Sequence, residues 1–204
     1  MSGITVDSLW HNRHDWFNLI ALPIIVLTNS LYLLSAPGDE HYFWLQFWTF
    51  MIYLVVDLLW IISIPKSVAA PVIIIAHHIA CIYGWSLPLY RSDLRKWCAC
   101  AASVEVNTFF LILRRVLTRQ SVVVDCLFCF SWIILRLILY PYLAFAYWNQ
   151  YADEMIAMSS HTIVTCFVLL LFLIYLNTKW TVDLANKTIF LRDSKRDLKD
   201  GLEV

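Results

Sequence analysis

The stretch FWLQFWTFMIYLVVDLLWIISI, residues 43–64, carries a single charged residue, Asp57, among mostly apolar and aromatic side chains. A helix needs about 20 mostly apolar residues to cross the hydrocarbon core of a bilayer, and this stretch is long enough. Similar runs recur along the chain, and together they predict spans at residues 16–34, 43–64, 70–90, 97–113, 122–145 and 158–178. The sequence therefore predicts an all-α fold, a polytopic transmembrane helical bundle of about six spans.

The composition agrees with a membrane protein. Of the 204 residues, 61% are hydrophobic, whereas soluble domains contain about 45–50% apolar residues. A soluble domain of this size could not bury so much apolar surface. The formal net charge is zero, so no nucleic-acid partner is expected. We predict a cytosolic N-terminal segment at residues 1–15, a transmembrane domain at 16–180, and a flexible cytosolic polar tail at 181–204.

Basic residues predict the orientation, because cytosolic connections of membrane proteins carry an excess of Lys and Arg. With six spans, the N-terminal segment, the second and fourth connections and the tail share one side. Their basic residues are Arg13, Lys66, Arg114, Arg115, Arg119, Lys179, Lys187, Arg192, Lys195, Arg196 and Lys199. The opposite side has only Arg91, Arg95 and Lys96. Both termini are therefore predicted to be cytosolic.

A few polar side chains fall inside the predicted spans, where such groups usually face the protein interior and mark function. They are Asp57, His77, His78, Glu105, Asn107 and Arg136. A helix rise of about 1.5 Å per residue places Asp57 and the two histidines at a similar depth. Asp57 is therefore expected to contact one histidine, while the other faces a cavity or a neighbouring helix. A histidine oriented by Asp57 could act as a general base or a nucleophile.

Glu105 and Arg136 are also matched in depth, on the fourth and fifth predicted spans. Opposite charges at one depth are least costly in lipid when they pair, so we predict a Glu105–Arg136 ion pair with Asn107 nearby. This pair would either border a lipid site or only lock the bundle together.

Two other spacings suggest metal or redox chemistry only weakly. His11 and His14 form an H-x-x-H pair with no third ligand nearby. Cys126 and Cys129 form a C-x-x-C pair, but their flanks are apolar and no second pair accompanies them. We predict buried structural thiols and no metal site.

Five segments, taken in order, resemble the TLC-domain family, which includes ceramide synthases and translocon-associated TRAM proteins. They are Tyr53–Leu59, Ile75–Ile79, Glu105–Arg114, Phe130–Pro141 and Leu176–Trp180, and the resemblance covers about residues 40–180. It implies a bundle of membrane helices in the endoplasmic reticulum or another cellular membrane, including the plasma membrane. Family members handle or sense lipids.

Ceramide synthases join a fatty acyl-CoA to a sphingoid base, and their signature adds acidic residues after the His pair, notably an Asp pair. This chain offers only Asp93 there, so it looks more similar to the short, non-synthase TLC-domain proteins. Some of those are linked to membrane phospholipid composition and fluidity.

The resemblance implies a protein of lipid handling, sensing or homeostasis with membrane lipids as partners. One alternative is an N-acyltransferase that uses His77 or His78 and takes acyl-CoA as co-substrate; no other cofactor is expected. A second is a transporter or channel, which the four glycines in the chain disfavour. A third is a purely structural scaffold. The oligomeric state is left open.

Overall fold

The computed structural model describes residues 6–36, 39–117 and 121–200, with side chains described between residues 13 and 186. The helices in these ranges are α1 (Val6–Leu34), α2 (Glu40–Ser63), α3 (Pro71–Ser86), α4 (Arg95–Ala102), α5 (Glu105–Val116), α6 (Val122–Ser131), α7 (Tyr140–Ile156) and α8 (His161–Asp200). Four further elements lie between these helices. Three are short 3-10 turns, η1 (Pro65–Ser67), η2 (Leu87–Leu89) and η3 (Ser92–Leu94), and the fourth is a π-helical segment, η4 (Trp132–Leu139).

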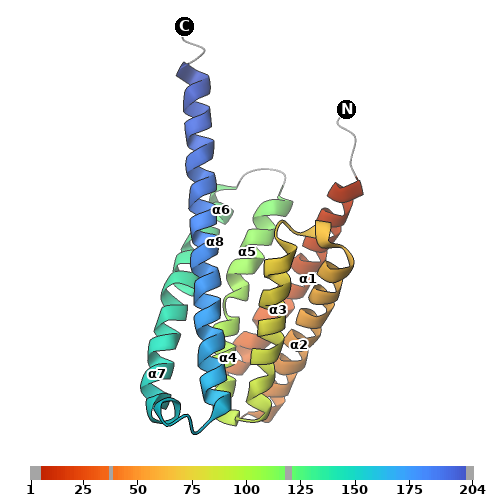
Figure 1. Ribbon diagram of the computed structural model, residues 1–204. Helices are drawn as coiled ribbons and strands as arrows, with labels where there is room; N and C mark the ends of the chain where they lie inside the picture. Colours follow the sequence, from red (N-terminus) through yellow and green to blue (C-terminus); the bar gives the residue numbers. More distant parts are fainter. Residues whose placement is uncertain (1–5, 37–38, 118–120, 201–204) are drawn as a thin grey trace.

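Six segments of the described chain are long and apolar enough to cross a membrane, which confirms the predicted bundle. They are Arg13–Leu34, Glu40–Ser63, Pro71–Leu89, Ser92–Val116, Val122–Ile156 and His161–Asn186. The fourth span joins η3, α4 and α5, and the fifth joins α6, η4 and α7. The beginning of α1 and the end of α8 lie at the same end of the bundle (Figure 1). We call this the termini end and the other the far end.

Local sequence explains where several helices begin. The Asp39 carboxylate accepts hydrogen bonds from the backbone amides of His41 and Tyr42, at 3.0 and 3.3 Å, at the start of α2. Pro71 occupies the first turn of α3, where its missing N–H costs nothing. The Ser121 hydroxyl accepts from the amide of Val124 at the start of α6.

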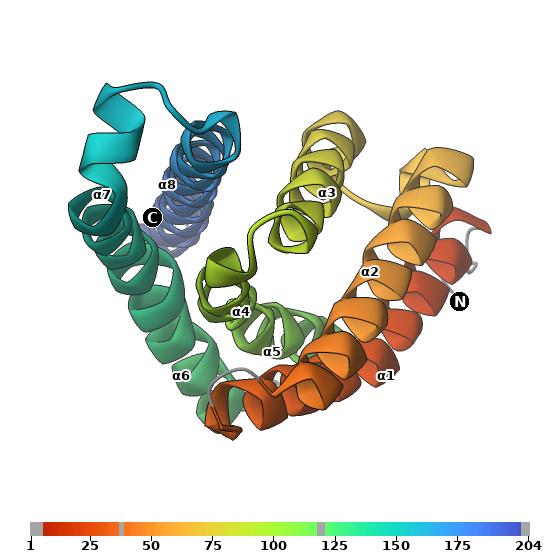
Figure 2. The same cartoon turned by 90° about the horizontal axis from the view of Figure 1, so that it is seen from below.

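The bundle has two apolar cores. The first lies mainly between α1 and α2, with contributions from α3, α4 and α5, and the second lies between α4, α7 and α8. Seen from the far end, α1 and α2 lie on one side, α7 and α8 on the other, and α4 between them (Figure 2). Trp85 of α3 closes one side of the first core: its ring meets Phe50 at 4.6 Å, and its indole N–H donates to the carbonyl of Phe47 at 3.2 Å.

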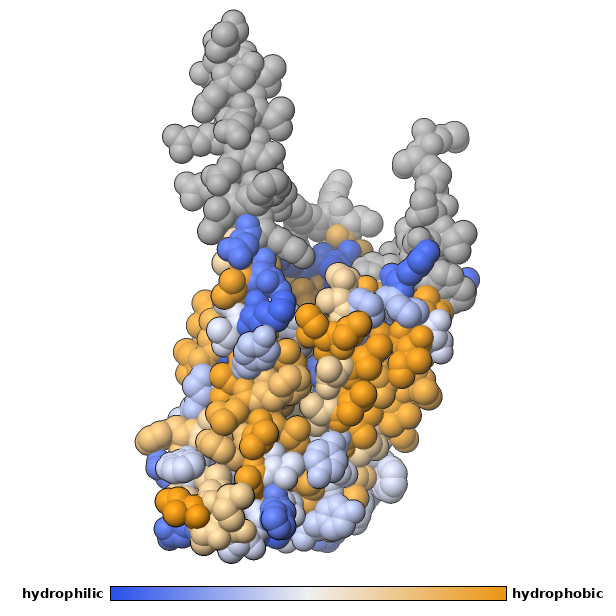
Figure 3. Space-filling view, viewed as in Figure 1, coloured by the Kyte–Doolittle hydropathy of each residue, from blue (hydrophilic) through white to orange (hydrophobic). Residues whose placement is uncertain are grey.

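Many large apolar side chains are exposed on the outer surface, including Ile20 of α1, Leu59 of α2 and Phe130 of α6. Apolar residues occupy much of the middle of the molecule, and hydrophilic residues gather toward its two ends (Figure 3). This distribution is the one expected for a protein whose solvent is lipid.

The polar residues that follow the sixth span continue its helix up to residue 200. Helix α8 continues through Lys179 to Asp200 and extends beyond the rest of the bundle (Figure 1). No glycine or proline occurs between residues 161 and 200 to interrupt the helix. The helix continues past the predicted end of the sixth span at residue 178, because polarity changes there but helix propensity does not.

Candidate functional site

The Asp57 carboxylate of α2 bridges two histidines from different helices. Its Oδ2 lies 2.8 Å from Nε2 of His78 on α3, and its Oδ1 lies 2.7 Å from Nε2 of His14 on α1. All three side chains are buried. The expected contact between Asp57 and one of the paired histidines is present, and it involves His78. We call His14, Asp57 and His78 the histidine cluster.

The geometry assigns the protons of His78. Its Nδ1 lies 2.9 Å from the carbonyl oxygen of Ile74, and a carbonyl cannot donate, so Nδ1 carries a hydrogen. The contact between Nε2 and the Asp57 carboxylate then holds a second proton, shared between the imidazole and the carboxyl group. His78 therefore has no free ring nitrogen to offer a substrate in this arrangement.

Asn18 and Tyr53 enclose the histidine cluster. The Tyr53 hydroxyl donates to Oδ1 of Asn18 at 2.8 Å, and the Asn18 amide donates to the carbonyl of His14 and to Asp57, at 3.1 and 3.4 Å. Sequence reasoning missed His14 because the first span was predicted to begin at residue 16. Its spacing of four residues from Asn18, which puts both on one face of a helix, is the signal that could have found it.

Arg136 does not form the predicted ion pair with Glu105. Among the described residues, no guanidinium nitrogen of Arg136 lies within 4.0 Å of a carboxylate oxygen of Glu105. Its guanidinium donates instead to the amide oxygens of Asn107 at 2.7 Å and Asn177 at 2.8 Å, and to the Thr108 hydroxyl at 3.1 Å. We call these four residues the arginine cluster. It joins α5, η4 and α8 deep in the bundle.

Helical phase explains the difference. Residues two apart on an α-helix point about 200° apart, and here Asn107 rather than Glu105 points at Arg136 of η4. Asn107 takes that position, and its own amide group donates to the Phe128 carbonyl at 3.1 Å and the Ser131 hydroxyl at 2.9 Å. Matched depth alone therefore predicted the wrong partner for Arg136.

Arg136 lies on the π-helical segment η4, immediately before α7. Pro141 in the first turn of α7 has no N–H to donate back to that segment. Wider π-helical turns often occur at functional sites because they change the direction of side chains. Here the segment carries both Arg136 and Trp132, whose ring lies 4.9 Å from the guanidinium carbon.

His77 lies between the two clusters. Its ring packs edge-on against His78, with centroids 5.5 Å apart, and against Trp180 of α8 at 5.4 Å. Trp180 in turn lies 5.7 Å from the Arg136 guanidinium carbon. The Cys81 thiol is 3.7 Å from Nε2 of His77. Unlike His78, His77 makes no contact with Asp57 within the described residues.

His77 and Glu105 border a cavity between α3, α4, α7 and α8. The cavity is open on one side, and the space between its walls and that opening is about 740 Å³. The rest of its wall is apolar, aromatic or cysteine, with small side chains such as Ala80 and Ala101 providing the space. The arrangement is an apolar cavity with one imidazole and one carboxyl group on its wall.

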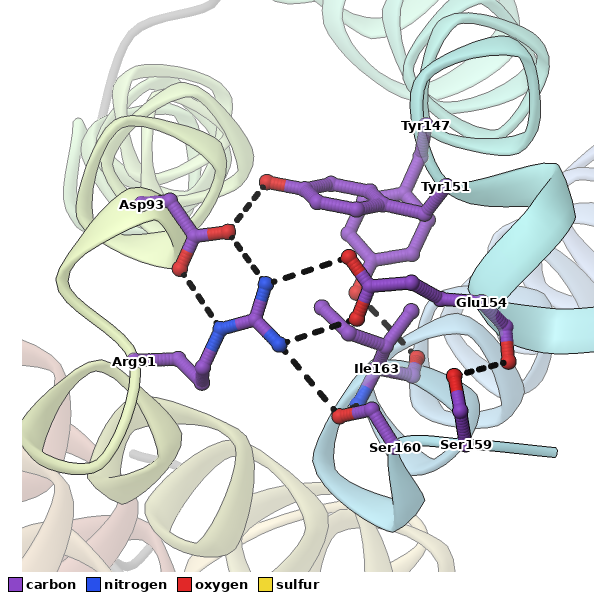
Figure 4. A network of polar contacts seen from close by, with 8 residues as sticks. All are labelled: Arg91, Asp93, Tyr147, Tyr151, Glu154, Ser159, Ser160 and Ile163. Atoms are coloured by element: carbon purple, nitrogen blue, oxygen red, sulfur yellow. Dashed lines mark hydrogen bonds and ion pairs between the residues drawn. The ribbon is translucent and has the colours of Figure 1, made fainter.

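A clamp of charged and polar groups joins the helices at the far end of the bundle (Figure 4). Arg91 donates to Asp93 at 2.7 Å and to Glu154 at 3.0 Å, which ties the connection after α3 to the end of α7. These two carboxylates, Asp93 above all, raise the pKa of Arg91, so the guanidinium keeps its charge. Tyr151 donates to Asp93 at 2.9 Å, and its neighbour Tyr147 lines the cavity.

A comparison with family models identifies the family of this chain. The TLC domain model matches residues 12–186. The chain belongs to the TLC-domain family. Searches of curated proteins and of solved structures gave no significant match. The TLC domain thus begins before the region of resemblance noted in the sequence, and it includes α1 with His14.

Within this TLC domain, no group of three or more His, Cys, Asp and Glu side chains is placed to hold a metal ion, in the part of the chain that is described. His11 of the H-x-x-H pair lies outside the described side chains. Cys126 and Cys129 are both exposed on α6, so the expectation that they are buried is wrong. Leu127 and Phe130 beside them are exposed as well, whereas Phe128 on the other face of α6 is buried against the bundle.

Proposed function

We propose that this TLC-domain protein binds a membrane lipid in the cavity between α3, α4, α7 and α8, and acts in lipid handling, sensing or homeostasis. We place it in the endoplasmic reticulum or plasma membrane, with both termini in the cytosol. The observation that carries the proposal is an apolar cavity that is open on one side and walled by transmembrane helices, with His77 and Glu105 on its surface.

Each part of the cavity has a role in this proposal. The leucine, alanine and aromatic wall takes the acyl chain, since burial of apolar surface favours it there. His77 and Glu105 offer hydrogen bonds to a polar part of the lipid. The histidine cluster and Trp180 hold His77 in place from two sides. The lipid site therefore depends on residues from at least four helices.

Filling the cavity tests this proposal. Ala80→Phe places a ring in the wall, so the amount of lipid that co-purifies with the protein should fall at least several-fold. Ala76→Phe is the matched control, because Ala76 lies one turn away on α3 and is exposed. Mass spectrometry of lipids extracted from both purified variants and the wild type measures the effect. Equal lipid content in all three proteins would contradict the proposal.

A second candidate is N-acyl transfer, which one observation favours: the cavity exposes His77, whereas His78 is already bound to Asp57. In this case His77 would act as the base that activates an amine, with acyl-CoA as co-substrate, and the histidine cluster would position it. Membranes that contain His77→Ala should then lose acyl transfer to an amine, while wild-type membranes retain it. Equal turnover in both would exclude this activity for His77.

A further inference from the structure

The outer face of α6 carries two cysteines that the lipid site does not use. Cys126 and Cys129 are exposed free thiols, one helical turn apart. We propose that Cys126 is a site of S-acylation by a long-chain acyl group, with Cys129 as a second acceptor.

The surface around these thiols faces lipid. Exposed apolar side chains precede and follow them: Val122 and Val123 are 76% and 67% exposed, and Phe130 is 67% exposed. An acyl chain attached to either thiol can therefore enter the bilayer directly, without displacing any packed side chain of the bundle. The cysteines that line the cavity, such as Cys81 and Cys166, have no such outlet to the outer surface of α6.

An ion pair marks the depth of Cys126. Asp125, the preceding residue, contacts Arg114 of α5 at 2.5 Å, and both side chains are more than a third exposed. The Arg114 guanidinium also lies 5.3 Å from the Phe128 ring of α6, so it is held against this helix. Half-exposed charges of this kind belong at the headgroup boundary. Cys126 thus lies at the boundary, and Cys129 about 4.5 Å deeper.

Cys126 also lies on the side of the membrane where an acyl-CoA donor is present. The termini end of the bundle carries Arg114 and Arg115, and the positive-inside rule places such residues in the cytosol. Juxtamembrane cysteines on that side are the usual acceptors of S-acylation. The Cys126 sulfur attacks the carbonyl carbon of an acyl-CoA, the bond from that carbon to the sulfur of coenzyme A breaks, and coenzyme A leaves with the thiol proton. One thioester replaces another, so no oxidant or reductant is needed.

The experiment is thioester capture from cells that express the full chain. Free thiols are blocked, thioesters are cleaved with hydroxylamine, and the newly exposed thiols are captured and quantified. Wild type should be captured only with hydroxylamine, Cys126→Ser should lose most of the signal, and Cys126→Ser/Cys129→Ser should lose all of it. Cys100→Ser, which removes a half-buried thiol of α4, should match wild type.

Two results would overturn the proposal. The first is a wild-type protein that shows no hydroxylamine-dependent capture. The second is capture that persists in Cys126→Ser/Cys129→Ser, which would place the acyl group on another cysteine. The amount of each variant in the membrane fraction is compared with that of the wild type. A variant that is as abundant as the wild type but is not captured has lost the thioester and not the protein.

Discussion

An Asp57→Leu variant is expected to unfold at a much lower temperature than the wild type. The change leaves His14 and His78 buried in the bundle without the carboxylate that both contact. Removing one partner of a buried charged pair costs about 3–5 kcal/mol, because the remaining group cannot regain water. Thermal unfolding of the purified protein in detergent, followed by tryptophan fluorescence, measures the effect. Val56→Ala, at an exposed neighbour on α2, provides the baseline.

A second variant separates loss of the pair from loss of packing. In His14→Leu/Asp57→Leu/His78→Leu, all three polar groups are replaced by apolar ones, so no imidazole is left without its partner, and the Asn18 amide keeps its bond to the backbone carbonyl of residue 14. Part of the lost stability should return, as it does when buried ionic groups are replaced together. If Asp57→Leu alone unfolds at the same temperature as Val56→Ala, the cluster contributes nothing to stability and the interpretation is wrong.

The second large effect is expected at Arg136. Arg136→Met leaves the amide oxygens of Asn107 and Asn177 without their charged donor, deep in the bundle. A buried acceptor left without its donor costs about 1–3 kcal/mol, and two such oxygens are affected, so we expect a clear loss in the free energy of unfolding. Because Trp180 lies between Arg136 and His77, the co-purifying lipid should decrease as well. Thermal unfolding in detergent measures the loss of stability, and mass spectrometry of the extracted lipids measures the decrease in co-purifying lipid.

Two controls make the Arg136 result specific. Arg136→Lys keeps the charge but cannot reproduce the planar, forked donor geometry, so it should fall between wild type and Arg136→Met. Arg114→Met makes the same substitution at a half-exposed arginine, where an ion pair contributes about 0–1 kcal/mol. An Arg136→Met protein as stable as Arg114→Met would show that the arginine cluster does not hold α5, η4 and α8 together.

The fold was predictable because hydropathy alone determines which segments can cross lipid. All six spans lie where the apolar runs predicted them, although the fifth extends to Ile156 and α1 begins earlier than residue 16. Those ends were missed because amphipathic residues near the interface continue a helix without raising its hydropathy. The helical continuation of α8 to Asp200 has the same cause.

The site was predictable only in part. Counting residues along each span gives depth, and depth correctly predicted that Asp57 meets one of the two paired histidines. It gives no rotation about the helix axis, so it could not distinguish Glu105 from Asn107 as the partner of Arg136. The π-helical segment that carries Arg136 changes the phase further. The cavity depends on how four helices pack, which no single segment of sequence encodes.

The positions of the two clusters along the chain have a consequence for biosynthesis. The histidine cluster is complete once residue 78 has been made, so α1, α2 and α3 can assemble while the rest of the chain is still on the ribosome. Arg136 meets Asn107 and Thr108 on its arrival, but Asn177 follows 41 residues later. The nascent chain therefore carries an incompletely bonded guanidinium through the membrane until its last helix enters. Truncation before residue 177 should leave a protein that membrane quality control recognises by this one group.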